Sequence, residues 1–470
     1  MFCIVSTINM MMEARPECIT ELCNLLQGQF PSQLEITILP DRSEEDDNDE
    51  NYLYLKDGIH LGIHAPNIPY LAKAFRNEYY TLRSLLNNKT IDENHLSWLE
   101  KRLWDAITCL LLICPDHATA WSDRKRLLIS DELGNCNAFY SEIIFLNLLF
   151  SQHSKAPNAW SHRKWTCKQI MKNNDSFERK HEFRKELLSW SQEEINTCIR
   201  IAEKYPKNYY AWTHRRYSIE TVMDLGACYA HEYGQNIDHI IAREALKQEL
   251  ESIQKWLQTH VSDHSAAHYG GVILRLMIIH NKECKDTLSY QHKIDNEVKV
   301  ETKHKPIDDV LQENMILCRD LIDKFASNEV IWIWRRISSK IHLEYLRDGL
   351  HLALLNQFVQ EEIDDVMKHH LNKDCVSEKE DHKRCILFGT TYILWLLASL
   401  RRNYQFFSLE NEGENGIIGG LNQDHEELSH DFCELEKRLI HSIGVSDDDS
   451  RTCTPASNIW SIKSGMISDS

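Results

Sequence analysis

Residues 206–215 read Pro-Lys-Asn-Tyr-Tyr-Ala-Trp-Thr-His-Arg, and related stretches recur along the chain. Their shared feature is a Trp followed three residues later by an Arg: Trp121 and Arg124, Trp160 and Arg163, Trp212 and Arg215, Trp332 and Arg335. A degenerate copy has Ala and Gly in these two slots, at positions 267 and 270. The five copies occupy residues 115–127, 154–165, 206–217, 263–274 and 328–337, so an internal repeat organises the chain.

Each copy of the motif is expected to open the second helix of a helical hairpin. In the third copy, apolar periodicity predicts a first helix over residues 193–205, a turn, and a second helix from Tyr209 with Asn208 as its N-cap. One hairpin cannot bury both of its apolar faces, so neighbouring hairpins must stack. The sequence therefore predicts an all-α fold, an α-α superhelix (solenoid) of helical hairpins over residues 68–402. Insertions near 224–240 and 283–306 are expected to form loops.

The flanking regions differ in composition from this helical body. Residues 1–67 contain two β-like stretches, LEITIL and NYLYL, which predict a small irregular or β-hairpin segment. Between them, residues 41–50 carry a net charge of −6, from seven acids and one Arg. Residues 403–470 carry a net charge of −9, and we expect them to be largely flexible apart from an amphipathic helix at 424–442. Because the whole chain has a net charge of −18, the rest of the chain outside these two acidic segments is left nearly neutral at −3.

Composition excludes several classes of protein. The acidic balance argues against a nucleic-acid-binding protein, whose phosphate contacts require a basic surface. The longest apolar runs are under ten residues, so no membrane span is expected, and no signal peptide is indicated. Fifteen Cys are scattered without a Cys-x-x-Cys pair, which is typical of reduced thiols and lacks the spacing of zinc ligands. We therefore expect a cytoplasmic protein that binds no metal itself.

The Trp and Arg of the motif are expected to have structural roles. A Trp and an Arg three residues apart lie on the same helix face. The Trp can fill the space between neighbouring hairpins. The Arg can lay its aliphatic stem on the ring and donate hydrogen bonds to free carbonyls at adjacent helix ends.

The stretch Pro206–Arg215 resembles the hallmark of protein prenyltransferase α-subunit repeats, and the resemblance covers roughly residues 95–345. It implies a crescent of hairpins wrapped around a second protein, the β subunit. In that family the β subunit holds the catalytic zinc and the prenyl diphosphate, so this chain is expected to bind no cofactor. The implied partners are such a β subunit, for which the Rab geranylgeranyltransferase β subunit is the choice, and a protein substrate with a C-terminal cysteine.

The resemblance also assigns candidate site residues. The catalytic lysine of the family's second repeat corresponds to Lys155, and Lys207 is an alternative cation in the best-preserved motif. The residues that face the isoprenoid diphosphate in the third repeat correspond to Asn208, Tyr209 and Tyr210. Two positions depart from the family, because a tyrosine slot holds Pro157 and a histidine slot holds Tyr210.

Three functions remain open at this point. The first is an α-type subunit of a heterodimeric protein prenyltransferase, which transfers a geranylgeranyl or farnesyl group to a cysteine and is active only with its β subunit. The second is a non-catalytic adaptor that binds a substrate protein or a Rab GTPase and promotes its prenylation by another enzyme. The departures at Pro157 and Tyr210 favour this adaptor somewhat. The third, a helical scaffold unrelated to prenylation, would leave the Pro-Lys-Asn-Tyr motif unexplained.

Overall fold

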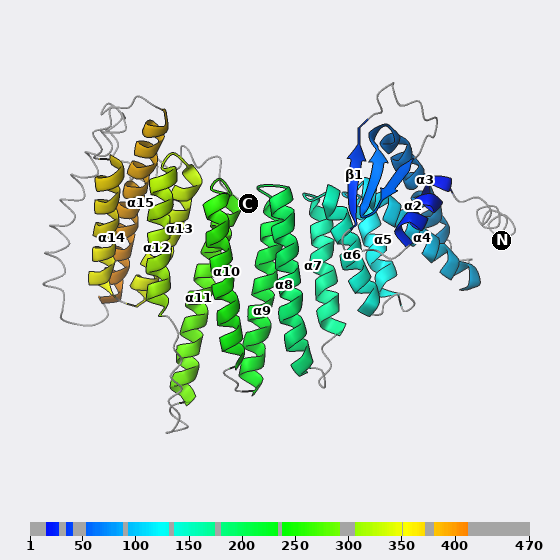
Figure 1. The fold of residues 1–470 in the computed structure, drawn as a ribbon. Helices are drawn as coiled ribbons and strands as arrows, with labels where there is room; N and C mark the ends of the chain where they lie inside the picture. Colours follow the sequence, from blue (N-terminus) through cyan, green and yellow to red (C-terminus); the bar gives the residue numbers. More distant parts are fainter. Residues whose placement is uncertain are drawn as a thin grey trace. The chain divides into compact units, whose positions relative to one another are not determined.

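The computed structural model describes residues 16–27, 34–40, 53–87, 93–130, 136–173, 180–233, 237–291, 306–349, 351–371 and 380–411. Helices dominate these residues, which confirms the all-α fold class (Figure 1). The chain forms two compact units, Met1–Asp224 and Leu225–Ser470. The division falls inside the region predicted as one solenoid. Residues 41–50 and the helix predicted at 424–442 lie outside the described residues.

The first unit contains a short N-terminal helix, a small sheet and the first helical repeats. Its helices are α2 (Glu17–Gln27), α3 (Ile68–Leu86), α4 (Glu93–Ile113), α5 (Ala118–Ile129), α6 (Cys136–Gln152), α7 (Pro157–Asn173), α8 (Lys180–Lys204) and α9 (Tyr209–Tyr233), which crosses the division. The pairs α4–α5, α6–α7 and α8–α9 are the hairpins that the first three motifs predict. Helix α9 begins at Tyr209 as expected, but α8 begins thirteen residues before the predicted start at 193.

The N-terminal strands correct one expectation. Strands β1 (Glu35–Leu39), β2 (Tyr54–Asp57) and β3 (His60–His64) form a sheet of order β1-β3-β2. The two β-like stretches do not pair with each other, because β3 lies between them, parallel to β1 and antiparallel to β2. Gly58, with a φ of 55°, allows the tight β2–β3 turn. Strand β3 was missed because its His-Leu-Gly-Ile-His sequence is poor in β-branched residues.

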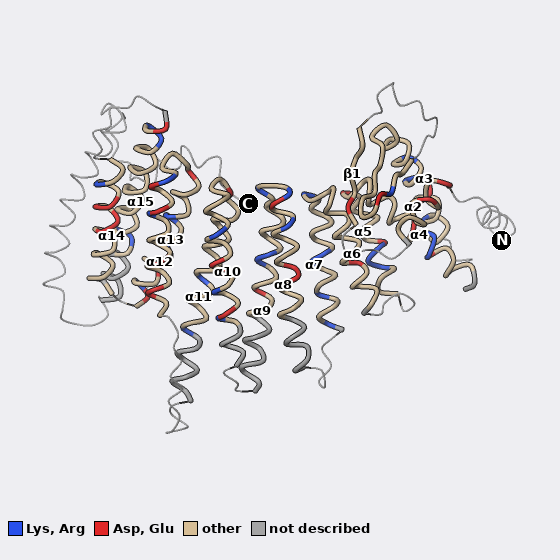
Figure 2. Tube along the Cα trace, in the orientation of Figure 1, with Lys and Arg blue, Asp and Glu red and all other residues tan. Residues whose placement is uncertain are grey.

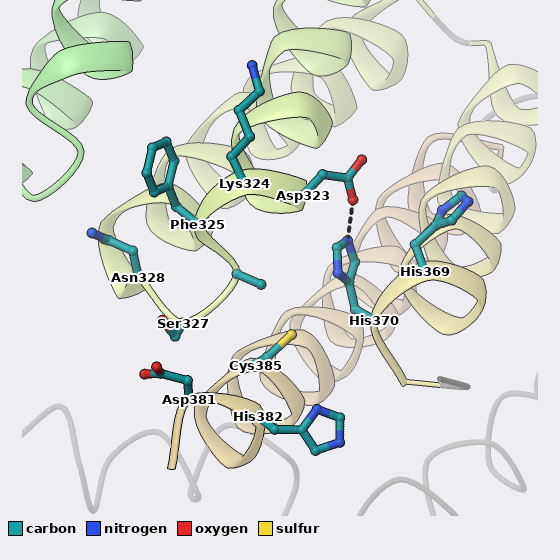
Figure 3. A pocket seen from close by; sticks show the side chains of 11 residues that line it. Asp323, Lys324, Phe325, Ser327, Asn328, His369, His370, Asp381, His382 and Cys385 are labelled. Carbon is teal, nitrogen blue, oxygen red and sulfur yellow. Dashed lines mark ion pairs between the residues drawn. The ribbon is translucent and has the colours of Figure 1, made fainter. Parts of the chain in front are cut away.

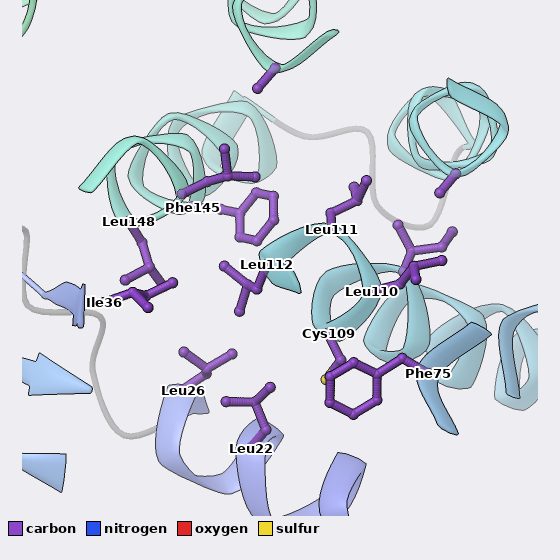
Figure 4. Packing of buried hydrophobic residues seen from close by; sticks show 14 of the residues in the cluster. Leu22, Leu26, Ile36, Phe75, Cys109, Leu110, Leu111, Leu112, Phe145 and Leu148 are labelled. Atoms are coloured by element: carbon purple, nitrogen blue, oxygen red, sulfur yellow. The ribbon is translucent and has the colours of Figure 1, made fainter. Parts of the chain in front are cut away.

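Apolar packing seats this sheet on the helical repeats. Helix α2, which was not predicted, contributes Leu22 and Leu26 to a core that also receives Ile36 of β1 and side chains of α4 and α6 (Figure 4). The backbone N–H of Ile36 donates to the hydroxyl of Ser151 at the end of α6, at 2.7 Å. The Tyr54 hydroxyl donates to the Cys18 carbonyl at 3.0 Å. Helix α2 and the sheet are therefore built into the first unit and pack on its first hairpins.

The second unit is helical in its described residues. It contains α10 (Ile237–Thr259), α11 (His264–Gln291), α12 (Ile307–Phe325), α13 (Glu329–Asp348), α14 (Leu352–Val366), a π-helical turn η3 (Met367–Leu371) and α15 (Glu380–Asn411). The insertions at 224–240 and 283–306 were expected to form loops. This was wrong, because almost all of their described residues are helical. Helices α9, α10 and α11 extend into those insertions, because lengthening a helix keeps its backbone hydrogen bonds satisfied.

One helix of the second unit bears on the expected absence of a membrane span. Within α15, the stretch Asp381–Asn403 is long and apolar enough to cross a membrane, and 56% of its most apolar window is buried inside the protein. Buried core helices of ordinary domains pass the same test. Its side chains Tyr392 and Leu396 are buried in the unit, so the expectation of no span stays a prediction.

Charged residues are distributed as the near-neutral helical body requires. Figure 2 shows Lys and Arg interspersed with Asp and Glu along the described helices of each unit. Several exposed pairs are neighbours, such as Arg216 with Glu220 at 2.7 Å and Arg275 with Glu344 at 2.9 Å. Exposed pairs of this kind contribute little stability, so the charges that matter for the fold are the buried ones.

The four motif tryptophans are buried, with 4–5% of their surface exposed. We expect Trp212→Ala to lower the free energy of unfolding by about 3–5 kcal/mol, because truncating a buried aromatic side chain leaves a cavity. Trp121, Trp160 and Trp332 should behave alike. Urea denaturation of the full chain measures the effect. Tyr209→Ala is the matched control, since Tyr209 is 56% exposed and follows the same turn; equal losses in the two variants would contradict the prediction.

Candidate functional site

The motif turns of the first unit are joined by side-chain hydrogen bonds. Asn208 donates from Nδ2 to the carbonyl of Ser154, at 2.9 Å, which links the α8–α9 turn to the α6–α7 turn. Asn158 donates from Nδ2 to the carbonyl of Asp116, at 3.1 Å, which links the α6–α7 turn to the α4–α5 turn. The three turns therefore form one row, which we call the turn row (residues 114–117, 153–158 and 205–209).

Both predicted catalytic lysines lie on the turn row. Lys155 follows Ser154 directly and is exposed. Lys207 precedes Asn208, is also exposed, and has a φ of 59° in the left-handed region. That conformation costs a non-glycine residue about 1–2 kcal/mol, so the surrounding hydrogen bonds must hold it in place. Because Asn208 binds Ser154, the structure brings the two lysine-bearing turns together.

The three predicted diphosphate-binding residues have different surroundings. Asn208 is fully buried, and its Oδ1 accepts from the backbone N–H of Ala211 at 3.3 Å, so its side chain caps α9 and ties two turns. Tyr209 is exposed and meets Tyr210 edge-to-face, with ring centroids 5.6 Å apart. Tyr210 is partly buried against the apolar core. Of the three, Tyr209 is the most exposed to a ligand on the turn row.

Pro157, which occupies the family's tyrosine slot, is the first residue of α7. Proline suits this position, because its missing N–H would have no partner in the first turn of a helix and its φ is preset for a helix. It offers no polar group to a ligand. A catalytic site on the turn row must therefore depend on the lysines and on Tyr209.

The motif tryptophans have a role that was assigned to the arginines. The indole N–H donates to the carbonyl six residues earlier: Trp121 to Pro115 at 2.6 Å, Trp160 to Ser154 at 2.8 Å and Trp332 to Ala326 at 2.8 Å. These carbonyls lie in the turns before each second helix. The expectation that Arg would donate to such carbonyls was wrong, because the Trp already reaches them.

The motif arginines instead bind buried carboxylates of the next hairpin. Arg124 donates through Nε and Nη2 to both oxygens of Glu142, at 2.6 and 2.7 Å. Arg163 binds Glu194 in the same way, at 2.7 Å for both bonds. In the second unit Arg335 binds Glu362 at 2.8 Å and Asp365 at 2.6 Å.

A histidine of the following motif completes the first two of these pairs. His162 Nε2 lies 2.7 Å from Glu142, and His214 Nε2 lies 2.6 Å from Glu194. Each carboxylate is thus shared by an Arg from one motif and a His from the next. We call these groups the Arg–Glu–His triads (Arg124–Glu142–His162 and Arg163–Glu194–His214). They connect consecutive hairpins through their cores.

The carboxylates of the triads were not predicted, although the sequence contains a signal for them. Three buried Glu residues lie twenty positions before the residue that contacts them: Glu142 before His162, Glu194 before His214 and Glu249 before Tyr269. These glutamates lie in the first helix of each hairpin, outside the Trp–Arg motif. The constant spacing of twenty residues to the second helix is the sequence signal for them.

The degenerate fourth copy is compensated by the fifth. Gly270 stands in the Arg slot of α11, and a Cβ at this position would lie 2.5 Å from the ring of Trp334. Trp334 takes the place of the motif histidine in α13 and is fully buried. The missing Arg side chain therefore leaves the room that the larger indole fills.

One triad lies close to a cysteine. Ligand atoms of Cys167, Glu194 and His214 are within 4.8 Å of one another, and all three residues are buried. Metal binding is disfavoured here, because both Glu194 oxygens already bind the buried guanidinium of Arg163. The other triad has Leu128 where this one has Cys167, so the arrangement does not require a cysteine. We interpret this group as structural.

The triads set the charge states of their members. Burial alone would raise the pKa of Glu142, but the charge of Arg124 and the hydrogen bond from His162 outweigh it and lower the pKa to about 2. Glu194 is held at about 2 in the same way by Arg163 and His214. Burial lowers the pKa of both histidines, so neutral imidazoles donate to ionised carboxylates.

These pKa shifts predict acid sensitivity. The two glutamates and the two histidines have a lower pKa in the folded chain than in the unfolded chain. As the pH falls, the unfolded chain therefore binds more protons than the folded chain. The free energy of unfolding should drop as the pH falls below about 6.5 for the histidines, and again from about 4.5 towards 2 for the glutamates. Urea denaturation at a series of pH values measures this.

The matched variant is Glu194→Gln. It should lose about 3–5 kcal/mol at neutral pH, because Arg163 is left buried without its counter-charge. It should also show a shallower fall between about pH 4.5 and 2 than the natural chain, because one shifted carboxylate is gone. Parallel curves for the two proteins in that range would contradict this reading of the triads.

Comparison with known proteins agrees with the repeats. Residues 191–222, which contain the third motif, match the protein prenyltransferase alpha subunit repeat. The chain is 29% identical over 264 residues to protein prenyltransferase alpha subunit repeat-containing protein 1 of Danio rerio, covering 53% of this chain and 56% of the relative. It is 28% identical over 272 residues to the Homo sapiens protein of that name, covering 54% of this chain and 61% of the relative.

The match thus spans little more than half the length of these curated relatives. The motif that carried the resemblance, the hairpins it predicted and the repeat match all agree. The predicted resemblance is confirmed: residues 191–222 match the protein prenyltransferase alpha subunit repeat, and over about half of its length the chain is similar to proteins named for that repeat.

Proposed function

We propose that this chain is the α-type subunit of a heterodimeric protein prenyltransferase and acts with a zinc-containing β subunit. The observation that carries the proposal is the turn row, where Lys155 and Lys207 lie exposed on two turns joined by the Asn208–Ser154 hydrogen bond. Two ammonium groups and the Tyr209 phenol on one row suit an anion. The anion in question is the diphosphate of a geranylgeranyl or farnesyl donor.

Electrostatic stabilisation explains why lysines are suited to this position. Transfer of the prenyl group breaks a carbon–oxygen bond, and negative charge grows on the departing diphosphate. A nearby ammonium stabilises that charge more in the transition state than in the ground state. Lysine is a compact, flexible point charge, so it can follow a leaving group as it moves.

The backbone of Lys207 adds support to this assignment. A left-handed φ is unfavourable for lysine, and glycine would fit the turn without strain. Strained residues of this kind cluster at functional sites. The side chain is exposed and has no role in the described core, so a role in binding accounts for a lysine at this position.

The partners follow from the proposed reaction. The β subunit, by resemblance that of Rab geranylgeranyltransferase, would supply zinc to activate the substrate cysteine as a thiolate. The substrate would be a cytoplasmic protein with a C-terminal cysteine. The contribution of this chain would be to bind the diphosphate end of the lipid donor and to hold the β subunit.

A non-catalytic adaptor is the second candidate. It is favoured by Pro157, which offers no hydrogen bond, and by Tyr210, which packs partly into the core. An adaptor would use the same turn row to bind an acidic segment of a substrate protein or of a Rab GTPase. In that case the lysines would affect binding of the substrate protein and leave the chemical step unchanged.

Single-turnover prenyl transfer distinguishes the two candidates. With a β subunit present, Lys155→Ala or Lys207→Gly should lower the rate by about 10²-fold, because one cation next to the developing charge is lost. Tyr209→Phe should cost about tenfold, as one neutral hydrogen bond is lost. Rates that stay intact in both lysine variants would reject the catalytic role and favour the adaptor.

Glycine is chosen at position 207 to separate charge from strain. Lys207→Gly removes the strain of the left-handed φ, which stabilises the folded chain. It also gives the unfolded chain more conformational freedom, which offsets that gain, so the free energy of unfolding should change little. Lys168→Ala is a control for general loss of positive charge, because Lys168 is an exposed lysine on α7, away from the turn row. A similar loss of rate in this control would show that the effect is not specific to the turns.

Partner dependence is a further expectation of the proposed function. Obligate subunit interfaces bury about 2,000 Å² or more, and a chain without its partner exposes that surface. The chain alone should self-associate or precipitate, and coexpression with the β subunit should yield a defined heterodimer in light scattering. A monodisperse monomer with no affinity for a prenyltransferase β subunit would count against both candidates that involve prenylation.

A further inference from the structure

A pocket in the second unit gathers side chains that bind transition metals. Its volume is about 440 Å³, and it lies between the end of α12, the η3 turn and the start of α15 (Figure 3). Its lining includes three imidazoles, one thiol and two carboxylates: His369, His370, His382, Cys385, Asp323 and Asp381. No motif residue of the turn row belongs to it, and the proposed prenyl transfer does not use it.

Three of these side chains come from three different helical elements. In the view of Figure 3 the imidazole of His370 lies between the carboxylate of Asp323 and the thiol of Cys385, whereas the ring of His382 turns away. His370 and Cys385 are 5% and 8% exposed, so their ligand atoms are sheltered at the base of the pocket. Asp323 is 59% exposed and can rotate over them.

The spacing of the first two groups is unusual for an ion pair. His370 Nε2 lies 3.7 Å from Asp323 Oδ1, beyond hydrogen-bond distance. Two ligands that bind a tetrahedral zinc at about 2.0–2.1 Å lie about 3.3–3.4 Å apart. A small movement of the exposed carboxylate would therefore place both atoms around one ion. The thiol would also need to close in, because its sulfur is not within 4.8 Å of both other ligand atoms.

The surroundings hold the imidazole in place. The ring of Trp332 packs edge-on against His370, with centroids 5.5 Å apart, and Trp332 is itself fixed by its hydrogen bond to Ala326. The preceding residue, His369, is bound through Nδ1 to Asp365 at 3.1 Å, and Asp365 is bound to Arg335. This part of η3 is therefore tied to the repeat core, which preorganises the pocket.

We infer that this pocket is a zinc site, with His370 Nε2, Cys385 Sγ and an Asp323 carboxylate oxygen as protein ligands. Nitrogen, sulfur and oxygen donors together suit zinc, whereas magnesium and calcium select oxygen alone. The Cys385 thiol releases its proton as the Zn–S bond forms, so the bound ion is neutralised by one thiolate and one carboxylate. The open side of the pocket leaves the fourth position to water or to an incoming ligand.

Zinc titration of the full chain without a β subunit tests the inference, because any metal of the partner is then absent; the chain is kept dilute enough to stay in solution. After treatment with a chelator, the chain competes with a chromophoric chelator for zinc. We expect a single equivalent to bind. Asp323→Asn, His370→Ala and Cys385→Ser should each weaken the affinity for zinc by at least tenfold. Loss of a group that merely hydrogen-bonds to a metal ligand already costs about tenfold or more, and loss of the ligand itself costs more.

Cobalt(II) provides an independent readout. Cobalt bound in the site should show the ultraviolet charge-transfer band of a cobalt–thiolate bond, and Cys385→Ser should abolish this band while His382→Ala retains it. Because the Asp323 side chain is exposed, Asp323→Asn should fold normally. It therefore still tests the site if the variants at the buried positions fail to fold. Absence of zinc binding, or an unchanged affinity in both Asp323→Asn and Cys385→Ser, would overturn the inference.

Cys167→Ser and Cys114→Ser are the matched thiol controls. The first removes the cysteine beside the Arg163–Glu194–His214 triad, and the second removes a partly buried thiol of the first unit. Both should keep the affinity of the natural chain. Loss of zinc binding in Cys167→Ser with retention in Cys385→Ser would move the site to the triad and reject the pocket.

Discussion

The structure depends on one interaction: the guanidinium of a motif arginine is buried next to a carboxylate from the following hairpin, as it is for Arg124, Arg163 and Arg335. A buried charge costs several kcal/mol to desolvate, and only good geometry with a full set of hydrogen bonds offsets that cost. Arg124 and Arg163 meet this condition with two bonds each to one glutamate. Such a pair adds little net stability, but it penalises every stacking in which the charges do not meet. It therefore fixes the register between neighbouring hairpins.

The motif tryptophans make a second kind of contact, with the turn that precedes their helix. The indoles of Trp121, Trp160 and Trp332 tie their helices to the preceding turns, so the geometry of a turn is coupled to the packing of a core. The turns carry the exposed residues of the proposed site. The position of Lys155 is thus set by Ser154, whose carbonyl accepts from both Trp160 and Asn208. A surface that would bind a diphosphate is positioned by buried hydrogen bonds.

Repetition made much of the fold predictable from sequence. The motif predicted the hairpins and the start of α9, because it recurs along the chain and because Asn is a favoured N-cap. It did not predict the partners of Arg163 and Arg335, which lie in helices without a motif and depend on tertiary packing. Strand β3 and helix α2 were missed for a related reason: each is short and is stabilised mainly by the core it joins. For the candidate site, the sequence located the lysines, but it could not show that Asn208 is buried and joins two turns.

The contact between Gly270 and Trp334 limits how these repeats can be exchanged. In a regular array any hairpin could be duplicated, deleted or moved, since each presents the same surfaces to its neighbours. Here the α10–α11 hairpin has a hollow that is filled by the next hairpin alone. Transplanted beside another repeat, it would leave a void, while α13 beside a regular arginine would clash. The two hairpins therefore form one structural unit. A larger side chain at position 270 fits only if the residue at position 334 becomes smaller.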